Sequence, residues 1–130
     1  MTVIYLVGQE TLLDYETFTV GFARRATLYK RMDFVFSDIN RLRCICEKRG
    51  KIQFIFSGKS HPQDWQGKEL IRKVFEFSRQ LKDKMKIVYL GNYDMDIAKA
   101  LVSGVDLWLN TPKRPNEASG TSGMKAAHNG

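Results

Sequence analysis

The apolar residues of this chain change their spacing repeatedly, and the changes predict alternating strands and helices. Four short runs are rich in branched and aromatic residues, which is typical of strands. They span residues 17–23, 52–58, 86–92 and 105–110. The run IQFIFSG at 52–58 is apolar almost throughout, as strands buried on both faces of a parallel sheet are. We therefore expect these strands to lie at the centre of the fold.

Between and after the strands, apolar residues recur at the three- and four-residue intervals of an amphipathic helix. Three helices and the beginning of a fourth are predicted, over residues 32–49, 70–81, 94–104 and 124–130. The first has basic residues in its last turn and Gly50 just beyond, which is a common helix end. Strands and helices that alternate through short loops are typical of an α/β fold, a parallel sheet with flanking helices.

A polar segment follows each predicted strand. These segments cover residues 23–31, 57–62, 91–94 and 110–125. Open α/β sheets bind ligands at the carboxyl ends of their strands, so we expect all four segments along one edge of the sheet. Residues 1–16 fit this pattern less well and form an N-terminal extension of uncertain structure. Residues 17–130 are predicted to be one partial domain.

The 130 residues are enough for one domain, and their formal net charge is +7. Such a charge is typical of a solvated basic surface, a nucleic-acid-binding protein, or a site for a phosphorylated small molecule. No stretch approaches the ~20 apolar residues of a transmembrane helix, so no membrane partner is expected. The opening residues have no basic lead and no small-residue cleavage site, which argues against a signal peptide.

The cysteines and histidines give no sign of a disulfide or a metal site. Cys44 and Cys46 are two residues apart in a predicted helix, so their side chains point to different sides. We expect reduced thiols, as in a cytoplasmic protein. His61 and His128 have no cysteine or histidine neighbour at metal-ligand spacing, so no metal is predicted.

Two segments have the composition of a phosphate site. Residues 120–123 (GTSG) precede a predicted helix, whose N-terminus carries about half a positive charge. Lys125 follows in the first turn of that helix. Arg24, Arg25, Lys30 and Arg31 place four cations within eight residues, just after a strand. Each feature has an ordinary alternative, since such loops also cap helices and basic turns are usually solvated. Together they could hold two phosphates, because arginine offers a planar fork and lysine a compact charge.

The segments VGFARRATLYKR, FSGKSHPQD and YLGNYDMDIAKALVSGVDLWLNTPKRPNEASGTSGMKAAHNG resemble, in order and spacing, the α-glucan phosphorylases. These enzymes act on glycogen, starch or maltodextrin and use pyridoxal 5'-phosphate. The likeness covers residues 18–130, is strongest to the shorter bacterial and archaeal branch, and rests most on NTP followed by EASGTSGMK. It implies an incomplete, Rossmann-like C-terminal domain of a GT-B-type glycosyltransferase. On this resemblance, the N-terminal domain that faces the cleft is expected to lie outside the 130 residues.

The resemblance implies a cofactor site. Lys125 would hold pyridoxal phosphate through its aldehyde carbon. Arg24 and the N–H groups of residues 121–123 would bind the cofactor phosphate. Asn110 would meet the pyridoxal 3-hydroxyl, and Tyr93 would pack on the ring. The implied cofactor-binding residues are therefore Lys125, Arg24, Thr121, Ser122, Gly123, Asn110 and Tyr93.

The resemblance also implies a substrate site. Arg25 would bind the substrate phosphate and Lys30 would lie between the two phosphates, so that Lys30, Arg25 and Lys125 would be the catalytic side chains. The hydroxyls of the transferred sugar would contact Glu117, Ala118, Ser119 and Gly120. The implied reaction is phosphorolysis, in which inorganic phosphate releases the terminal glucose of an α-1,4-glucan as α-glucose 1-phosphate.

Other interpretations remain open from the sequence. Without the facing domain, the isolated chain is expected to be inactive. A nucleotide-sugar glucosyltransferase resembling glycogen synthase would share the architecture, but it would carry two acids in an E-x7-E pattern where this chain has Glu117 and Lys125. A basic binding module without catalysis has only the charge in its favour, and no nucleic-acid motif is present. The fragment could also have no function of its own. Oligomeric state is left open.

Overall fold

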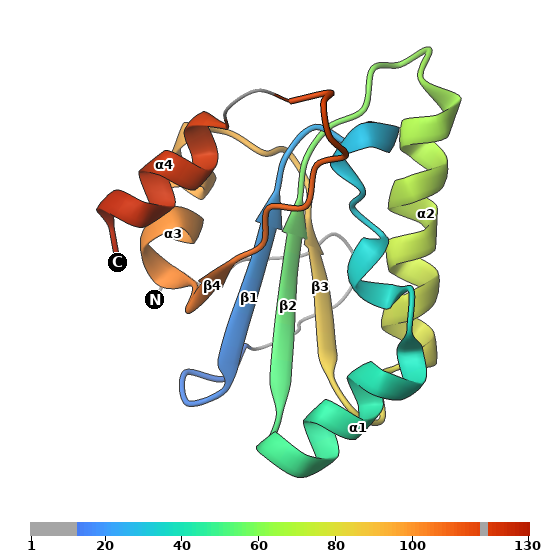
Figure 1. Cartoon of the computed structure of the whole chain (residues 1–130), viewed down its shortest axis with the longest axis vertical. Helices are drawn as coiled ribbons and strands as arrows, with labels where there is room; N and C mark the ends of the chain where they lie inside the picture. The colour runs from blue at the N-terminus through green and yellow to red at the C-terminus, as the bar shows by residue number, and fades with distance from the viewer. Residues whose placement is uncertain (1–12, 118–119) are drawn as a thin grey trace.

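The computed structural model describes residues 13–117 and 120–130. Four parallel strands form one sheet in the order β3-β2-β1-β4 (Figure 1). They are β1 (Phe18–Ala23), β2 (Ile52–Ser57), β3 (Lys86–Leu90) and β4 (Leu107–Trp108). Each lies within its predicted run, and the predicted α/β class with a parallel sheet is confirmed.

β4 is the shortest strand and joins the sheet beside β1. The carboxylate of Asp106 accepts a hydrogen bond from the Thr19 N–H at 2.8 Å. A side chain is thus the acceptor here, in place of the backbone carbonyl of a neighbouring strand. Beyond this point the Leu109 N–H donates to the Gly21 carbonyl at 2.8 Å. Regular pairing is therefore limited to a few residues, although the chain stays beside β1 up to the polar segment that follows.

Helices cover both faces of the sheet. α1 (Ile39–Arg49) and α2 (Trp65–Gln80) lie on one side, and α3 (Met95–Gly104) and α4 (Thr121–His128) on the other (Figure 1). Alternate residues of β2 point to opposite faces, as strand geometry requires. Phe54 and Phe56 belong to the core beneath α1 and α2, whereas Ile55 belongs to the smaller core beneath α3.

Aromatic rings fill the larger core. Phe36, between β1 and α1, is 3% exposed. Its ring stacks on Phe77 of α2 with 4.5 Å between the centroids, and it lies 5.7 Å from Phe56. One side chain from the segment between β1 and α1 thus joins the sheet to α2.

The predicted helix over 32–49 is wrong in its first part. Residues 34–36 form a short 3-10 helix, and α1 begins only at Ile39. The Asp38 carboxylate accepts a hydrogen bond from the Arg41 N–H at 2.9 Å, so Asp38 caps the helix rather than continuing it. Met32 and Phe36 are nevertheless buried, as their apolar spacing predicts. Apolar spacing indicates which residues are buried, but it does not show whether they belong to an α-helix or to a short 3-10 helix.

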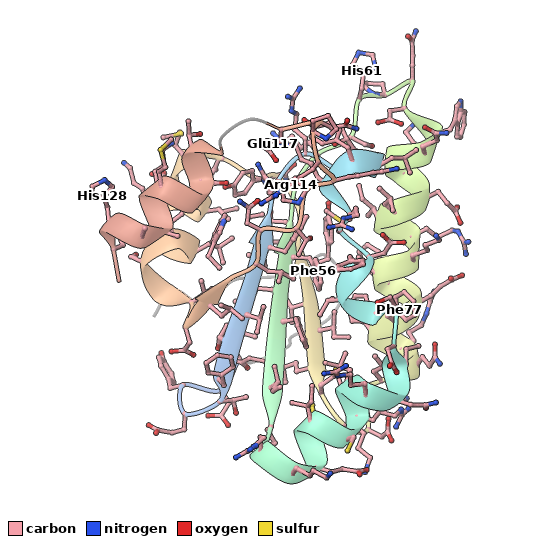
Figure 2. The ribbon with its side chains drawn as sticks, viewed as in Figure 1. Phe56, His61, Phe77, Arg114, Glu117 and His128 are labelled. Carbon is pink, nitrogen blue, oxygen red and sulfur yellow. The ribbon has the colours of Figure 1, made fainter. Side chains whose placement is uncertain are left out.

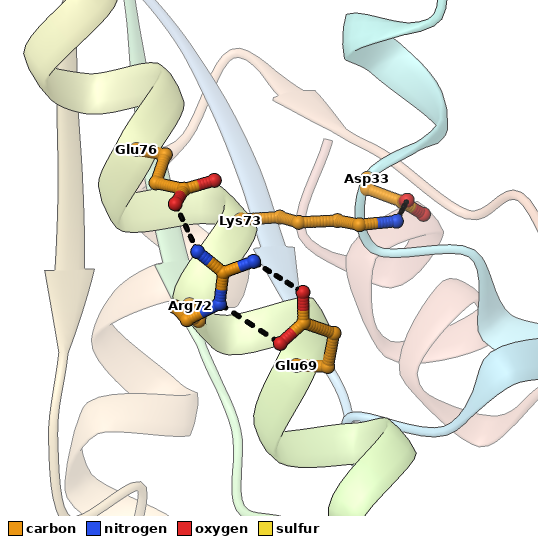
Figure 3. Close-up of polar contacts among 5 residues, drawn as sticks. All are labelled: Asp33, Glu69, Arg72, Lys73 and Glu76. Carbon is orange, nitrogen blue, oxygen red and sulfur yellow. Dashed lines mark hydrogen bonds and ion pairs between the residues drawn. The ribbon is translucent and has the colours of Figure 1, made fainter.

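α2 begins five residues before its predicted start, because the Asp64 carboxylate caps it by accepting from the Gly67 N–H at 2.9 Å. On its exposed face, Arg72 forms ion pairs with Glu69 and Glu76 (Figure 3). Lys73 reaches Asp33 at 3.3 Å and links α2 to the segment before α1. Within residues 13–117 and 120–130, no helix is both long and apolar enough to cross a bilayer.

Candidate functional site

The segments that follow β1 and β2 are hydrogen-bonded to each other at the carboxyl edge of the sheet. The Arg24 N–H donates to the Ser57 carbonyl and the Ala26 N–H to the Lys59 carbonyl, both at 3.1 Å. Gly58 makes this approach possible: its φ is +152°, and a Cβ there would overlap the Arg24 carbonyl oxygen. The backbone that leads into the basic cluster is therefore fixed by the strand next to it.

Arg24 points inward and is 6% exposed. Its guanidinium donates from Nη1 to the Asn110 side-chain oxygen and from Nη2 to Glu117. Arg25, the next residue, is exposed. Adjacent arginines therefore differ in role, since one is held within the protein and the other is accessible from solvent.

Lys30 ends the short 3-10 helix η1 (Leu28–Lys30) and is 8% exposed. The segment is fixed from the β4 side, because the Arg31 Nε donates to the Thr111 carbonyl at 2.7 Å and the Lys113 N–H to the Tyr29 carbonyl at 2.6 Å. The Lys30 ammonium then lies 3.3 Å from Glu117 Oε1. Elements far apart in sequence thus bring Lys30 and Arg24 to the same carboxylate.

Glu117, labelled in Figure 2 near the carboxyl ends of the strands, is contacted by both Arg24 and Lys30. Its side chain is 12% exposed, and both cations contact the same oxygen, Oε1. The hydrogen bond from Arg24, and to a lesser degree the one from Lys30, holds the pKa of this carboxyl below its usual value. Ala118 and Ser119, the next two predicted sugar-binding residues, lie outside the described residues.

Helix α4 begins at Thr121, earlier than the sequence pattern predicts. Gly120 is its N-cap and makes no side-chain cap hydrogen bond, and the Met124 N–H donates to the Gly120 carbonyl. The N–H groups of residues 121–123 therefore belong to the first turn, where an α-helix offers them no internal acceptor. Lys125 lies in the second turn, not the first, and shares a face with Thr121 because the two are four residues apart.

An open pocket of about 560 Å³ collects most of the predicted side chains. Its lining includes four basic residues, Arg24, Arg25, Lys30 and Lys125. Predicted residues Tyr93, Glu117, Thr121 and Ser122 also line it. Asn110, Gly120 and Gly123 are not among its described lining residues. Asn110 accepts a hydrogen bond from Arg24, and a Cβ on either glycine would lie within 3.6 Å of the Asn110 amide nitrogen.

Four lining residues were missed by the sequence interpretation: Ala23, Asp94, Met95 and Ala98. Ala23 ends β1, and the other three follow Tyr93 at the start of α3, in a polar strand-end segment for which the sequence suggests a role only for Tyr93. Asp94 also caps α3 by accepting from the Ile97 N–H at 2.9 Å. Burial raises the pKa of the Tyr93 hydroxyl. One wall of the pocket therefore combines the Tyr93 ring, the Asp94 carboxylate and the apolar side chains of Met95 and Ala98.

The donor set suits a phosphorylated aldehyde. A primary amine on Lys125 lies on the same helix face as Thr121, next to first-turn N–H groups that bind anions well. Arg25 adds an exposed guanidinium, and Tyr93 offers a flat apolar surface. No three His, Cys, Asp or Glu side chains cluster as metal ligands in the described part of the chain. The residues present therefore fit a cofactor with a phosphate, an aldehyde and an aromatic ring.

Comparison with known proteins gives a consistent family match. The family model described as carbohydrate phosphorylase matches residues 22–130. Maltodextrin phosphorylase of Thermococcus litoralis is 50% identical over 119 residues, which are 91% of this chain and 14% of that protein. Glycogen phosphorylase of Aquifex aeolicus is 45% identical over 126 residues, 96% of this chain and 18% of the relative.

A glycogen phosphorylase of Mycobacterium tuberculosis is 47% identical over 121 residues, which cover 92% of this chain and 14% of the mycobacterial protein. The chain therefore spans less than a fifth of the length of these relatives. The match includes both the basic cluster after β1 and the segment from Glu117 to Lys125.

Proposed function

This chain belongs to the carbohydrate phosphorylase family, and on that premise we propose that it forms the cofactor-binding part of an α-1,4-glucan phosphorylase. One observation carries the proposal: Lys125, the first turn of α4 and the basic residues after β1 line a single pocket. The reaction of the whole enzyme would be reversible phosphorolysis. Inorganic phosphate would release terminal glucose from the glucan as α-glucose 1-phosphate.

Pyridoxal 5'-phosphate would be held by Lys125 at its aldehyde carbon, by the N–H groups of residues 121–123 and Arg24 at its phosphate, and by Tyr93 at its ring. Asn110 would face the 3-hydroxyl and also holds the Arg24 guanidinium. When bound, the cofactor supplies an ionisable phosphate able to exchange a proton with the substrate phosphate. The protein residues hold and orient this group.

Arg25 and Lys30 would receive the substrate phosphate. Two like charges 4–5 Å apart repel by about 4 kcal/mol at an effective dielectric of 20. The basic residues that line the pocket, together with the positive end of α4, would offset this repulsion. Glu117 and Gly120, with Ala118 and Ser119, would contact the sugar hydroxyls.

The sugar and the rest of the glucan would require a second domain facing this pocket, in a GT-B arrangement. A cytoplasmic location would suit the free thiols of Cys44 and Cys46. A nucleotide-sugar glucosyltransferase is disfavoured, because it would need an acid where this chain has Lys125.

Cofactor attachment can be tested on the chain itself. Incubation with pyridoxal 5'-phosphate, reduction with borohydride and peptide mapping should find the pyridoxyl group mainly on Lys125. Lys125→Arg keeps the charge but removes the primary amine, so the adduct should be lost. Lys99→Arg, at an exposed position of α3, is the matched control and should keep it. An adduct spread evenly over exposed lysines and unchanged in Lys125→Arg would reject the proposal.

A further inference from the structure

The pocket already contains an anion that belongs to the protein. Glu117 Oε1 accepts from Arg24 Nη2 and lies 3.3 Å from Lys30 Nζ. A Cβ placed on Gly120 would lie 3.6 Å from the same oxygen, so the carboxylate is also next to the N-cap of α4. Two cations and the positive end of a helix thus meet at one carboxylate oxygen.

The other oxygen of this carboxylate is poorly satisfied. Among the described residues, Glu117 Oε2 is buried and has no hydrogen-bond partner. An ionised carboxylate has about four acceptor sites, and leaving a buried oxygen unpaired costs free energy. A tetrahedral oxyanion could make bonds to both cations at once, and the Glu117 carboxylate would then be free to pair elsewhere.

We propose that Glu117 is a resident counter-ion of Arg24 and Lys30, the cations placed above at the cofactor phosphate and the substrate phosphate, and that it pairs with both until a phosphate displaces it. This inference rests on the proposed function and adds a step to it. Displacement would release the carboxylate toward the sugar hydroxyls that it is proposed to contact. Occupation of the site by phosphate and correct placement of the sugar-binding acid would then be coupled.

Asn110 can hold the Arg24 side chain in place while phosphate replaces Glu117. Its side-chain oxygen accepts from Arg24 Nη1, whereas Glu117 takes Nη2. The guanidinium therefore keeps Asn110 as a partner when Glu117 leaves. Because arginine can donate to a phosphate from two nitrogens in a fixed plane, a guanidinium held in place loses less entropy on binding.

The test is to titrate the chain with inorganic phosphate in the absence of pyridoxal phosphate. Amide NMR or calorimetry measures the affinity. Glu117→Gln removes the competing charge and keeps the shape of the side chain. Its affinity for phosphate should be at least about tenfold higher than that of the wild type, as expected for release of charge-assisted hydrogen bonds. Equal affinities within twofold, or weaker binding by the variant, would overturn the proposal.

Glu47→Gln is the matched control for charge. It changes the net charge by the same amount, at an ion pair in which Lys84 Nζ lies 3.1 Å from Glu47 Oε1. Its phosphate affinity should stay within about twofold of the wild type, as expected for a change at an exposed, screened ion pair. An increase equal to that of Glu117→Gln would show a general charge effect and would also overturn the proposal.

The wild-type chain offers a second measurement if Glu117→Gln does not fold. Saturating phosphate should move the carboxylate carbon resonance of Glu117 and leave that of Glu47 unchanged; an unmoved Glu117 resonance at saturation would contradict displacement. Neither measurement uses pyridoxal phosphate. Failure of the Lys125 adduct would therefore leave this result intact, and failure here would leave the adduct intact.

Discussion

The positions of Arg24 and Lys30 depend on the hydrogen-bond acceptors around them. Arg24 is buried because Asn110 and Glu117 satisfy two of its nitrogens, whereas the Arg25 side chain is exposed and pairs with no side chain within residues 13–117 and 120–130. A buried cation without partners would cost several kcal/mol. Arg24 therefore carries a charge that is held in place by the protein, whereas the charge of Arg25 is accessible to a ligand.

A single glycine fixes the backbone beneath this charge. Gly58→Ala should lower the free energy of unfolding and weaken phosphate binding together, because its Cβ would overlap the Arg24 carbonyl oxygen at a positive φ. Urea unfolding and phosphate titration of the same sample measure both effects.

Gly91→Ala is the control, since a Cβ there would meet nothing within 4 Å. It should change neither quantity measurably. If Gly58→Ala behaved like Gly91→Ala, the contact between the ends of β1 and β2 would not be what positions Arg24.

Residue types and spacing predicted most of the pocket's lining, but not its contacts. The basic cluster and the Glu117–Lys125 segment were expected at one sheet edge, because parallel strands place their carboxyl ends together. The pairing of Arg24 with Glu117 crosses 93 residues, and that of Lys30 with Glu117 crosses 87. Spacing along the chain carries no information on which charges meet over such separations.

At the scale of elements, the aromatic core joins α2 to the sheet. Phe36→Ala should reduce the free energy of unfolding by about 3–5 kcal/mol, because a buried phenyl ring is lost and a cavity remains. That is a large part of the ~5–15 kcal/mol expected for a small domain. Thermal or urea unfolding measures the loss.

Phe75→Ala tests whether burial of the ring is the reason for the loss of stability expected in Phe36→Ala. Phe75 is 46% exposed and its ring lies 5.4 Å from that of Tyr89. Its removal should cost clearly less than that of Phe36. Equal losses would contradict the central place given to Phe36.

Strands were easier to predict than helix starts. Burial on both faces gives β2 a continuous apolar run, which few alternatives can produce. The starts of α1 and α2 depend instead on the carboxylates of Asp38 and Asp64, which cap backbone N–H groups three residues on. From the sequence alone, each of these aspartates could equally lie in a loop or at an exposed position inside a helix.

At the scale of the molecule, a second pocket among the described residues lies at the end of the sheet opposite to the pocket that Lys125 lines. This second pocket, of about 630 Å³, is lined by the first residues of β2 and β3, by Arg79 in the last turn of α2, and by basic residues after α2, including Lys82 and Lys84. It is larger than the 560 Å³ pocket, so neither size nor basic charge identifies the proposed phosphate site. The distinction rests on α4, whose first turn offers N–H groups only at the carboxyl edge.

The most direct test is therefore to map the binding of pyridoxal 5'-phosphate on the whole chain by amide NMR, with pyridoxal, which lacks the phosphate, as the comparison. The account predicts that the amides of Thr121, Ser122 and Gly123 shift with pyridoxal 5'-phosphate and shift far less with pyridoxal. Shifts that map instead to Arg79, Lys82 and Lys84, or that are the same for both compounds, would contradict it.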